Sequence, residues 1–246
     1  MVGGLAIGIL DSISALSSGA SANYPILHLD AAEGVNGGTA LNGHAVYEWA
    51  DQSGNNNNFV QSIAAGQPIY NTSGINGLPS ITFDVKRMDL LNSRLLGTDY
   101  TIYLVFKTTA NATATAYKTI FSFSNNGVFA QGNGRVGMAV DNGYTNFYYD
   151  DRIARTAIIP HDSNAHYFTI SNGLVGGTAK KQIYADGVNY INGSASIDSS
   201  QLQHFLGSWN GQHGNFEISE LIAYSAKHTT TKQNEIELYL KNKYGL

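Results

Sequence analysis

Two pairs of carboxylates are the residues with the clearest chemical potential in this sequence. Glu217 and Glu220 stand three positions apart in an apolar stretch, and Asp84 and Asp89 stand five apart. A retaining glycosidase needs two carboxyl groups roughly 5 Å apart, and alternate residues of a strand supply such a pair on one face. The two glutamates face opposite sides of a regular strand, and the two aspartates resemble turn residues. Solvated or turn roles are therefore favoured over catalysis for all four.

A catalytic nucleophile lacks the surroundings that it needs. The sequence has seven histidines, but it has no cysteine and no Gly-x-Ser-x-Gly elbow to place a serine. His161 and His166 straddle a turn and the start of a strand, which favours two separate surface histidines. We therefore expect no enzymatic activity and rank a glycoside hydrolase third among the functional hypotheses.

Oxygen-bearing loop residues raise the question of a bound cation. Calcium prefers carboxylate and carbonyl oxygens, and the candidate ligands are Asp30, Asp51, Asn55, Asp150 and Asp151. These residues do not form a spaced calcium motif, so roles in stabilising turns are favoured. Asp51 and the asparagines after it predict a turn whose side chains bond to its own backbone. We expect no cofactor, and calcium is the alternative.

Two loops combine aromatic rings with hydrogen-bonding side chains. A sugar can stack its apolar face on a ring while amides, carboxylates or guanidinium groups bond its hydroxyls. The candidate carbohydrate-binding residues are Tyr149, Asp151 and Arg152 in the loop that begins at Tyr148, and Trp209, Asn210, Gln212 and His213 in the second loop. Glycines near the second loop predict an exposed, tight turn. The same aromatic residues could instead cover sheet edges, and both interpretations stay open.

Short strands must position these loops. The 246 residues include 27 glycines, 15 tyrosines and 10 phenylalanines, and only 13% are charged. Turn signals separate about a dozen segments rich in β-branched and aromatic residues. The pattern predicts an all-β fold, a two-sheet antiparallel jelly-roll sandwich, over residues 24–246.

The end of the chain predicts the last strand and a terminal helix. Apolar and polar residues alternate over 216–222, with a slip at Glu220–Leu221 that indicates a bulge. Threonines at 229–231 favour a helix start, apolar residues at helical spacing follow, and Gly245 suits the helix end. Such a helix needs a large sheet to pack against.

Three motifs carry a resemblance to a known family. They are Leu-His-Leu-Asp-Ala at 27–31, Trp-Ala-Asp-Gln-Ser-Gly-Asn-Asn-Asn at 49–57 and Tyr-Leu-Lys-Asn-Lys-Tyr-Gly at 239–245. In this order they resemble laminin-G-like modules of the concanavalin A-like lectin/glucanase superfamily, over nearly all of residues 24–245. The resemblance implies a jelly roll whose sugar sites move between loops and whose relatives often bind calcium. The glucanase strand motif Glu-x-Asp-x-x-Glu is absent, and we expect Trp49 in the core.

Residues 1–23 form an arm of different composition. Asp11 is the only charged residue in the arm. Four of its apolar residues lie roughly on one helical face, and they are Leu5, Ile9, Ile13 and Leu16. A signal peptide is the alternative, but no Lys or Arg lies near Met1 and the apolar run is short. We favour a docking arm, because such a stripe left exposed is an aggregation risk.

Charge and hydropathy argue against two classes of partner. The net charge is −4, Lys and Arg total only 14, and no basic run appears, so a nucleic acid is not expected. No stretch approaches the length of a membrane span.

The leading hypothesis is a non-catalytic glycan-binding, lectin-like module displayed on a larger assembly such as a virion, as a tail, fibre or decoration protein. Its expected partners are a glycan or host-surface polysaccharide and, through the arm, other chains of a homo-oligomer or larger assembly. The expected location is a virion or an extracellular surface. The alternative is a purely structural protein of a virion or surface assembly.

Overall fold

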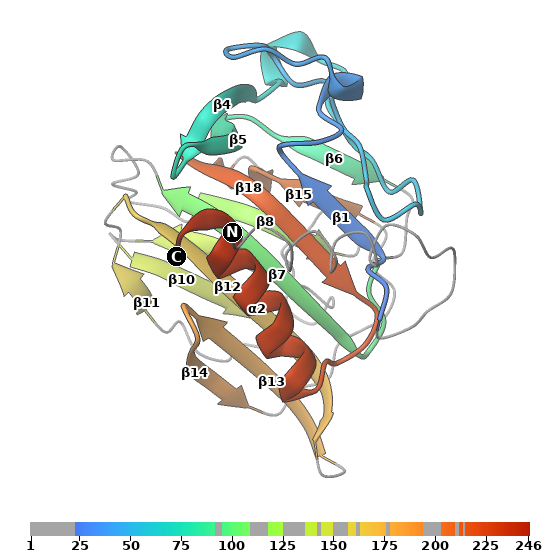
Figure 1. Ribbon diagram of the computed structural model, residues 1–246, viewed down its shortest axis with the longest axis vertical. Helices are drawn as coiled ribbons and strands as arrows, with labels where there is room; N and C mark the ends of the chain where they lie inside the picture. The colour runs from blue at the N-terminus through green and yellow to red at the C-terminus, as the bar shows by residue number, and fades with distance from the viewer. Residues whose placement is uncertain are drawn as a thin grey trace, which may run out of the picture.

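The computed structural model is a sandwich of two antiparallel sheets with one helix on its outside (Figure 1). It describes residues 23–91, 95–108, 118–124, 136–141, 144–149, 157–160, 163–175, 178–193, 203–209, 212–213 and 215–246. The predicted all-β, two-sheet antiparallel sandwich is confirmed. The arm residues 1–22, with Leu5, Ile9, Ile13 and Leu16, lie outside the described residues.

Sheet A has eight strands, in the order β14, β13, β12, β7, β18, β5 and β4, with β1 also paired to β18. Their bounds are β1 Leu27–Asp30, β4 Ile69–Ile75, β5 Leu78–Asp84, β7 Tyr100–Thr108, β12 Ala165–Val175, β13 Thr178–Ala185, β14 Val188–Gly193 and β18 Asn215–Tyr224. Strand β7 is almost entirely buried, as its β-branched and aromatic sequence predicts for a central strand.

Sheet B has ten strands, in the order β11, β10, β9, β8, β15, β6, β3 and β2, with the β16–β17 hairpin beside β8. Their bounds are β2 Glu48–Trp49, β3 Phe59–Val60, β6 Met88–Leu91, β8 Lys118–Ser124, β9 Val136–Asp141, β10 Tyr144–Tyr149, β11 Ala157–Pro160, β15 Gln203–Leu206, β16 Ser208–Trp209 and β17 Gln212–His213. Two short 3-10 helices, η1 (Asn36–Gly38) and η2 (Ala64–Gly66), lie in the connections. The strands exceed the predicted dozen because several have only two residues.

The main core lies between the two sheets. Trp49, Phe59, Phe83 and Phe106 are among its fully buried side chains. The indole Nε1–H of Trp49 donates to the carbonyl of Asp30 at 3.0 Å, which satisfies its polar atom inside the core. The predicted core position of Trp49 is confirmed.

The terminal helix α2, Thr230–Tyr244, covers the outer face of sheet A (Figure 1). Thr229 Oγ1 accepts a hydrogen bond from the Lys232 N–H at 3.3 Å, and Gly245 ends the helix at φ 66°. The helix and the sheet share a second apolar cluster, which includes Tyr103, Val105, Tyr167, Ile222, Ile236, Tyr239, Leu240 and Tyr244. The predicted helix is confirmed, and none of the helices in the described part of the chain is long and apolar enough to span a membrane.

Strand β18 holds sheet A together. It pairs with β7 along its length, with β5 through Asn215–Ile218 and with β1 through Glu220–Ala223. Its register with β7 shifts between Ile218 and Glu220, so Ser219 is the extra residue of a bulge. The predicted bulge therefore exists, one position earlier than the alternation of the sequence indicates.

Candidate functional site

The bulge in β18 turns both glutamates toward the face of sheet A that carries α2. Ile218 and Leu221 both point into the core between the sheets. Because Ser219 takes the extra position, Glu217 and Glu220 share the opposite face although three positions separate them. The prediction of opposite faces holds only for a regular strand and is wrong for this one.

Glu217 links neighbouring strands of sheet A. One carboxylate oxygen accepts a hydrogen bond from Ser80 Oγ at 2.8 Å, and the other lies 3.5 Å from Lys107 Nζ. A Cβ at Gly74 would lie 2.5 Å from this carboxylate, so a glycine is needed for the close approach. These contacts assign Glu217 a structural role.

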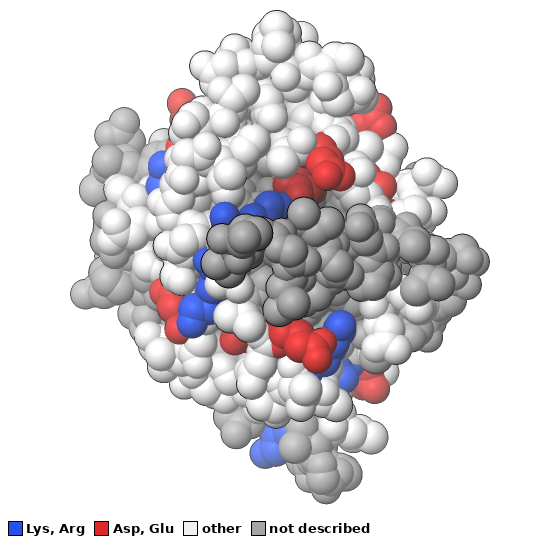
Figure 2. All heavy atoms as spheres, in the orientation of Figure 1, with Lys and Arg blue, Asp and Glu red and all other residues white. Residues whose placement is uncertain are grey.

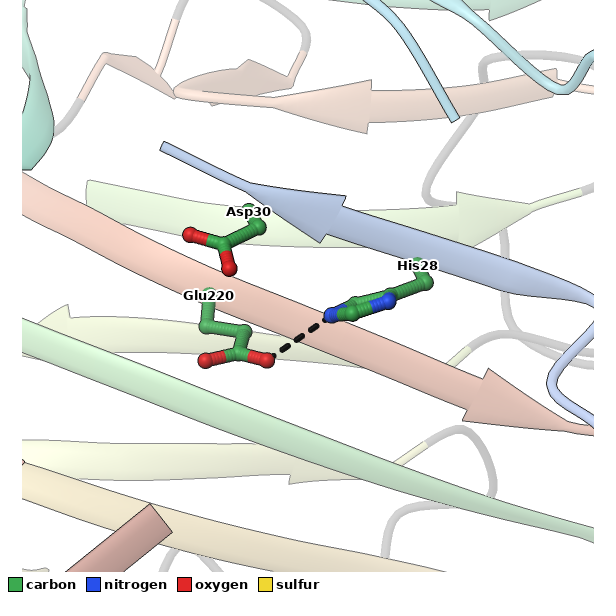
Figure 3. A group of neighbouring side chains, drawn as sticks. All are labelled: His28, Asp30 and Glu220. Atoms are coloured by element: carbon green, nitrogen blue, oxygen red, sulfur yellow. Dashed lines mark hydrogen bonds and ion pairs between the residues drawn. The ribbon is translucent and has the colours of Figure 1, made fainter. Parts of the chain in front are cut away.

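Glu220 is the centre of a buried ionic cluster between β1, β18 and α2. Figure 3 shows three residues of this cluster, His28, Asp30 and Glu220. The Glu220 side chain is 0% exposed, with one oxygen 2.8 Å from His28 Nε2 and the other 2.8 Å from Lys243 Nζ. Lys243 Nζ also lies 2.5 Å from Asp30, which the strand register places directly opposite Glu220. We call His28, Asp30, Glu220 and Lys243 the ionic cluster.

Two helix tyrosines complete the surroundings of Glu220. Tyr239 Oη donates to one carboxylate oxygen at 3.0 Å, and Tyr244 Oη donates to the other at 2.9 Å. A buried carboxylate is tolerated only when it is paired and hydrogen-bonded, and Glu220 meets both conditions. The first strand, the last strand and the terminal helix are thereby joined through one side chain.

The ionic cluster has the donor set of a metal site but already contains a cation. The ligand atoms of His28, Asp30 and Glu220 lie within 4.8 Å of one another. The Lys243 ammonium contacts both carboxylates, so a metal ion would have to displace it. Two carboxylates directly opposite each other repel, and Lys243 offsets that repulsion. We therefore assign the cluster to folding stability.

The ionic cluster shifts the pKa values of its members in opposite directions. Burial alone would raise the pKa of Glu220, but the hydrogen bond and charge of His28, together with Lys243, lower it to about 2. Burial alone would lower the pKa of His28, but the hydrogen bond and charge of Glu220 raise it above 6.5. The charged pair therefore stabilises the folded state over a limited pH range.

The melting temperature should show this range directly. The contribution of Glu220 to the free energy of unfolding is present above pH 4.5 and disappears as the pH falls toward 2, because its folded-state pKa is lowered from 4.5. The His28 contribution is complete below pH 6.5 and is lost as the pH rises through the raised folded-state pKa. Scanning calorimetry of His28→Gln should show a flatter alkaline limb than the wild type. His44→Gln, at an exposed histidine, is the control, and equal flattening by both variants would contradict this assignment.

Asp51 closes a turn, as predicted. Its carboxylate accepts hydrogen bonds from the backbone N–H groups of His28 at 2.9 Å, Ser53 at 2.9 Å and Asn57 at 3.0 Å. Because N–H donors point at both oxygens, this carboxylate suits a turn better than a cation site.

The other calcium candidates do not gather around Asp51. Asn55 uses its amide group to donate to the Pro25 carbonyl at 3.3 Å, and Asp30 belongs to the ionic cluster. Asp150 and Asp151 lie outside the described residues.

The second predicted sugar loop is a small hairpin. Trp209 pairs with Gln212 between β16 and β17, and His213 pairs with Thr119 of β8. Asn210 lies outside the described residues. The hairpin therefore sits beside sheet B, at the end of β8 that contains Thr119.

Of the first predicted sugar loop, the structure describes Tyr148 and Tyr149, at the end of β10. Tyr149 ends β10 and pairs with Val136 of β9, which in turn pairs with Phe123 of β8. The Phe123 side chain faces the core. Asp151 and Arg152 lie outside the described residues. Four positions separate Thr119 from Phe123, roughly 13 Å along a strand, so His213 and Tyr149 align with opposite ends of β8.

A polar and aromatic group that the sequence analysis missed lies on the outer face of sheet B. Arg87 Nε lies 2.6 Å from Asp89 Oδ1, and Arg87 Nη2 donates to Asp89 Oδ2 at 2.9 Å. The Arg87 guanidinium lies over the Phe205 ring, with Cζ 5.1 Å from the ring centroid. Asp89 was expected in a turn, but it lies in β6, and burial raises its pKa although Arg87 opposes the shift.

This group belongs to a row that crosses sheet B. The register aligns one residue from each of β6, β15, β8, β9 and β10, namely Asp89, Phe205, Ser122, Gly137 and Tyr148. Neighbours of the row such as Leu90 and Leu206 face the core, so the row belongs to the outer face. Five strands span roughly 19 Å at about 4.8 Å per strand. We call Arg87 together with this row the sheet B site.

The centre of the sheet B site is built from small residues. Ser122 is buried, and its hydroxyl has no hydrogen-bond partner among the described residues. Gly137, next along the row, has no side chain, and a glycine inside a strand often marks a close approach by a ligand. The sequence held one signal for this site, the spacing of Arg87 and Asp89. Residues two positions apart at the start of a strand place their side chains on the same face.

Comparison with known proteins identifies the fold and no family. No protein-family model and no curated protein matches the sequence. Solved structures do match. The binding domain of Paraclostridial Mosquitocidal Protein 1 has a TM-score of 0.59 at 14% identity, over 89% of this chain and 52% of that one.

Two further structures share this fold. The receptor binding domain of botulinum neurotoxin D has a TM-score of 0.58 at 14% identity, over 87% of this chain and 52% of that one. Trypanosoma rangeli sialidase in complex with sialic acid has a TM-score of 0.57 at 9% identity, over 96% of this chain and 37% of that one. The chain thus spans about half or less of the length of these structures, and identities this low show a shared β-sandwich fold alone.

Proposed function

We propose that this protein is a glycan-binding module and that the sheet B site is its binding surface. The observation that carries the proposal is the Arg87 guanidinium, which Asp89 holds from one side while Phe205 supports it from below. One of the five N–H donors of the guanidinium, on Nη2, makes a hydrogen bond to Asp89, and 41% of the Arg87 side chain is exposed.

A donor group held in this way suits sugar hydroxyls. The planar guanidinium of Arg87 is already ordered by Asp89 and Phe205, so binding costs little further side-chain entropy. The Asp89 carboxylate balances the charge of Arg87, which favours hydroxyl groups over a strongly anionic ligand. Ser122 follows Phe205 in the row and is buried beside it, so the exposed part of Arg87 is the donor group that we assign to the sugar.

The fold supports the same class of function. The similar structures carry the descriptions binding domain, receptor binding domain and sialidase in complex with sialic acid. We assign the chain to the concanavalin A-like superfamily, as a laminin-G-like module, on the motifs at 27–31, 49–57 and 239–245. We assign it no hydrolytic role, because Glu217 and Glu220 are engaged by structural partners.

The setting of the module is part of the same proposal. Residues 1–23 dock the module on other chains, in a homo-oligomer or a larger assembly. Display on a virion or another extracellular surface would place the sheet B site against host glycans.

Substitution of Arg87 tests the site. Arg87→Met keeps most of the apolar volume over Phe205 but removes the donors, and we expect at least a tenfold loss of glycan affinity, about 1.4 kcal/mol. Lys86→Met is the matched control, because the Lys86 ammonium contacts only the Ala65 carbonyl among the described residues. Isothermal titration with a glycan that the wild type binds measures both. Unchanged affinity in folded Arg87→Met would place the binding site elsewhere.

The Trp209 hairpin is the competing position for the site. If Trp209 stacks on sugar, Trp209→Ala should cost roughly 1–3 kcal/mol of affinity, by analogy with base stacking, and little stability. If Trp209 is packed in the fold, the same change should cost about 3–5 kcal/mol of folding stability. Melting temperature and glycan affinity of this variant separate the two, and lost affinity without lost stability would add the β16–β17 hairpin to the binding surface.

A further inference from the structure

Exposed apolar side chains are concentrated at one end of the sandwich. Six of the ten large apolar residues that are exposed in the described part of the chain come from residues 41–85, and they are Leu41, Tyr47, Val60, Ile63, Ile69 and Val85. Their exposed fractions run from 40% to 68%. We call these six residues the end patch. Such a concentration of exposed apolar surface usually marks an interaction site.

Backbone contacts bring the segments of the end patch together. The Gln61 N–H donates to the Tyr47 carbonyl, and Ala45 forms a bridge with Ile69. Near Val85, the Lys86 ammonium donates to the Ala65 carbonyl at 2.7 Å. The six residues therefore lie on neighbouring segments around η2.

The end patch carries little charge apart from Asp84 and Lys86, which flank Val85. No Asp, Glu, Lys or Arg occurs from residue 52 to residue 83, in a chain with 32 charged residues (14 basic plus 18 acidic). The blue-to-turquoise part of the chain forms the upper end of the molecule in Figure 1, and this end is white in Figure 2 except at its flanks. An uncharged apolar surface fits a partner of the same character, because a charged partner would lose hydration without gaining an ion pair.

The chain itself contains a segment of that character. Residues 1–22 include one charged side chain, Asp11, and four of their apolar residues, Leu5, Ile9, Ile13 and Leu16, fall on one face at helical spacing. An amphipathic segment that places such a face against an apolar surface is a common recognition mode.

The start of the described chain lies close to the segment that bears the end patch. Asn55 donates to the Pro25 carbonyl and Asn57 donates to the Ile26 carbonyl. Both asparagines belong to the turn that joins β2 to β3, and Tyr47 and Val60 lie on that hairpin. A segment of 22 residues reaches about 33 Å as a helix and further when extended, which is enough to cover the patch of its own or a neighbouring copy.

We propose that residues 1–22 occupy the end patch, with the stripe of Leu5, Ile9, Ile13 and Leu16 against Tyr47, Ile63 and Val85. The absence of cysteine from the sequence makes cross-linking a clean test. One variant carries Ile9→Cys with Ile63→Cys, and a second carries Ile9→Cys with Val85→Cys. Because Ile63 and Val85 are exposed, these changes should leave the fold intact, which circular dichroism checks.

A flexible bismaleimide should cross-link both variants several times faster than the control Ile9→Cys with Leu174→Cys. Leu174 is 66% exposed and lies near the end of β12, in the β12–β13 hairpin that points away from β4 (Figure 1). A cross-linked dimer would show docking on a second copy, as the proposed function expects. A cross-link within one chain would show docking on the same copy and would contradict only the docking of the arm on other chains. Either species supports the proposal, and equal rates in all three variants would overturn it.

Discussion

Replacing Lys243 with methionine should lower the free energy of unfolding by about 3–5 kcal/mol, because the change leaves buried carboxylates without their cation. Asp30 and Glu220 face each other across β1 and β18, and the Lys243 ammonium contacts both. Methionine keeps most of the side-chain volume, so the loss measures charge more than packing. Urea denaturation followed by tryptophan fluorescence gives the value.

The matched control lies two positions away on the same helix. Lys241 is exposed, so Lys241→Met should change the free energy of unfolding by less than about 0.5 kcal/mol. Adding Asp30→Asn and Glu220→Gln to Lys243→Met should recover part of the loss, because neutral amides do not repel each other. A loss of less than about 1 kcal/mol for Lys243→Met alone would contradict a stabilising role for the ionic cluster.

Replacing Gly207 with alanine should lower the free energy of unfolding by about 2–5 kcal/mol. This is the sum of a left-handed backbone penalty and a steric clash. Gly207 has φ 88°, and a Cβ there would lie 2.3 Å from the Lys86 carbonyl oxygen and 2.3 Å from Phe83. This glycine joins β15, which carries Phe205, to the hairpin that carries Trp209. Thermal unfolding should therefore show a large decrease in melting temperature.

Gly37→Ala separates the two terms of that cost. Gly37 also has a left-handed backbone, with φ 67°, but nothing lies within 4 Å of the position of its Cβ. We expect Gly37→Ala to lower the free energy of unfolding by the backbone penalty alone, about 1–2 kcal/mol. Equal losses in the two variants would show that the close contact between Gly207 and the Lys86 carbonyl is not significant for stability.

Local patterns were sufficient to predict the fold. The β-branched run of β7, the Thr229 cap and the Gly245 stop are short-range signals, and the structure confirms each of them. The turn at Asp51 was predictable for the same reason, because its hydrogen bonds reach only to nearby residues and to β1.

The ionic cluster could not be predicted because its members are distant in the chain. His28 and Glu220 are 192 positions apart, and only the pairing of β1 with β18 brings them together. The bulge at Ser219 reversed the expected relation between Glu217 and Glu220, because one extra residue changes the face of every later side chain.

The sheet B site was missed for a related reason. Arg87 and Asp89 resemble a polar turn in the sequence, and their significance depends on Phe205, which lies more than a hundred positions further along the chain. The predicted loop residues Asp151, Arg152 and Asn210 lie outside the described residues, so they stay predictions.

Binding of the wild-type protein to an array of immobilised glycans tests the central claim most directly. We expect saturable binding to at least one class of glycan, and we expect Arg87→Met to lose this signal while Lys86→Met keeps it. The glycans should remain uncleaved after incubation, as expected for a module without paired catalytic carboxylates. A folded protein that binds no glycan on the array, or that binds equally well without the Arg87 guanidinium, would contradict the account.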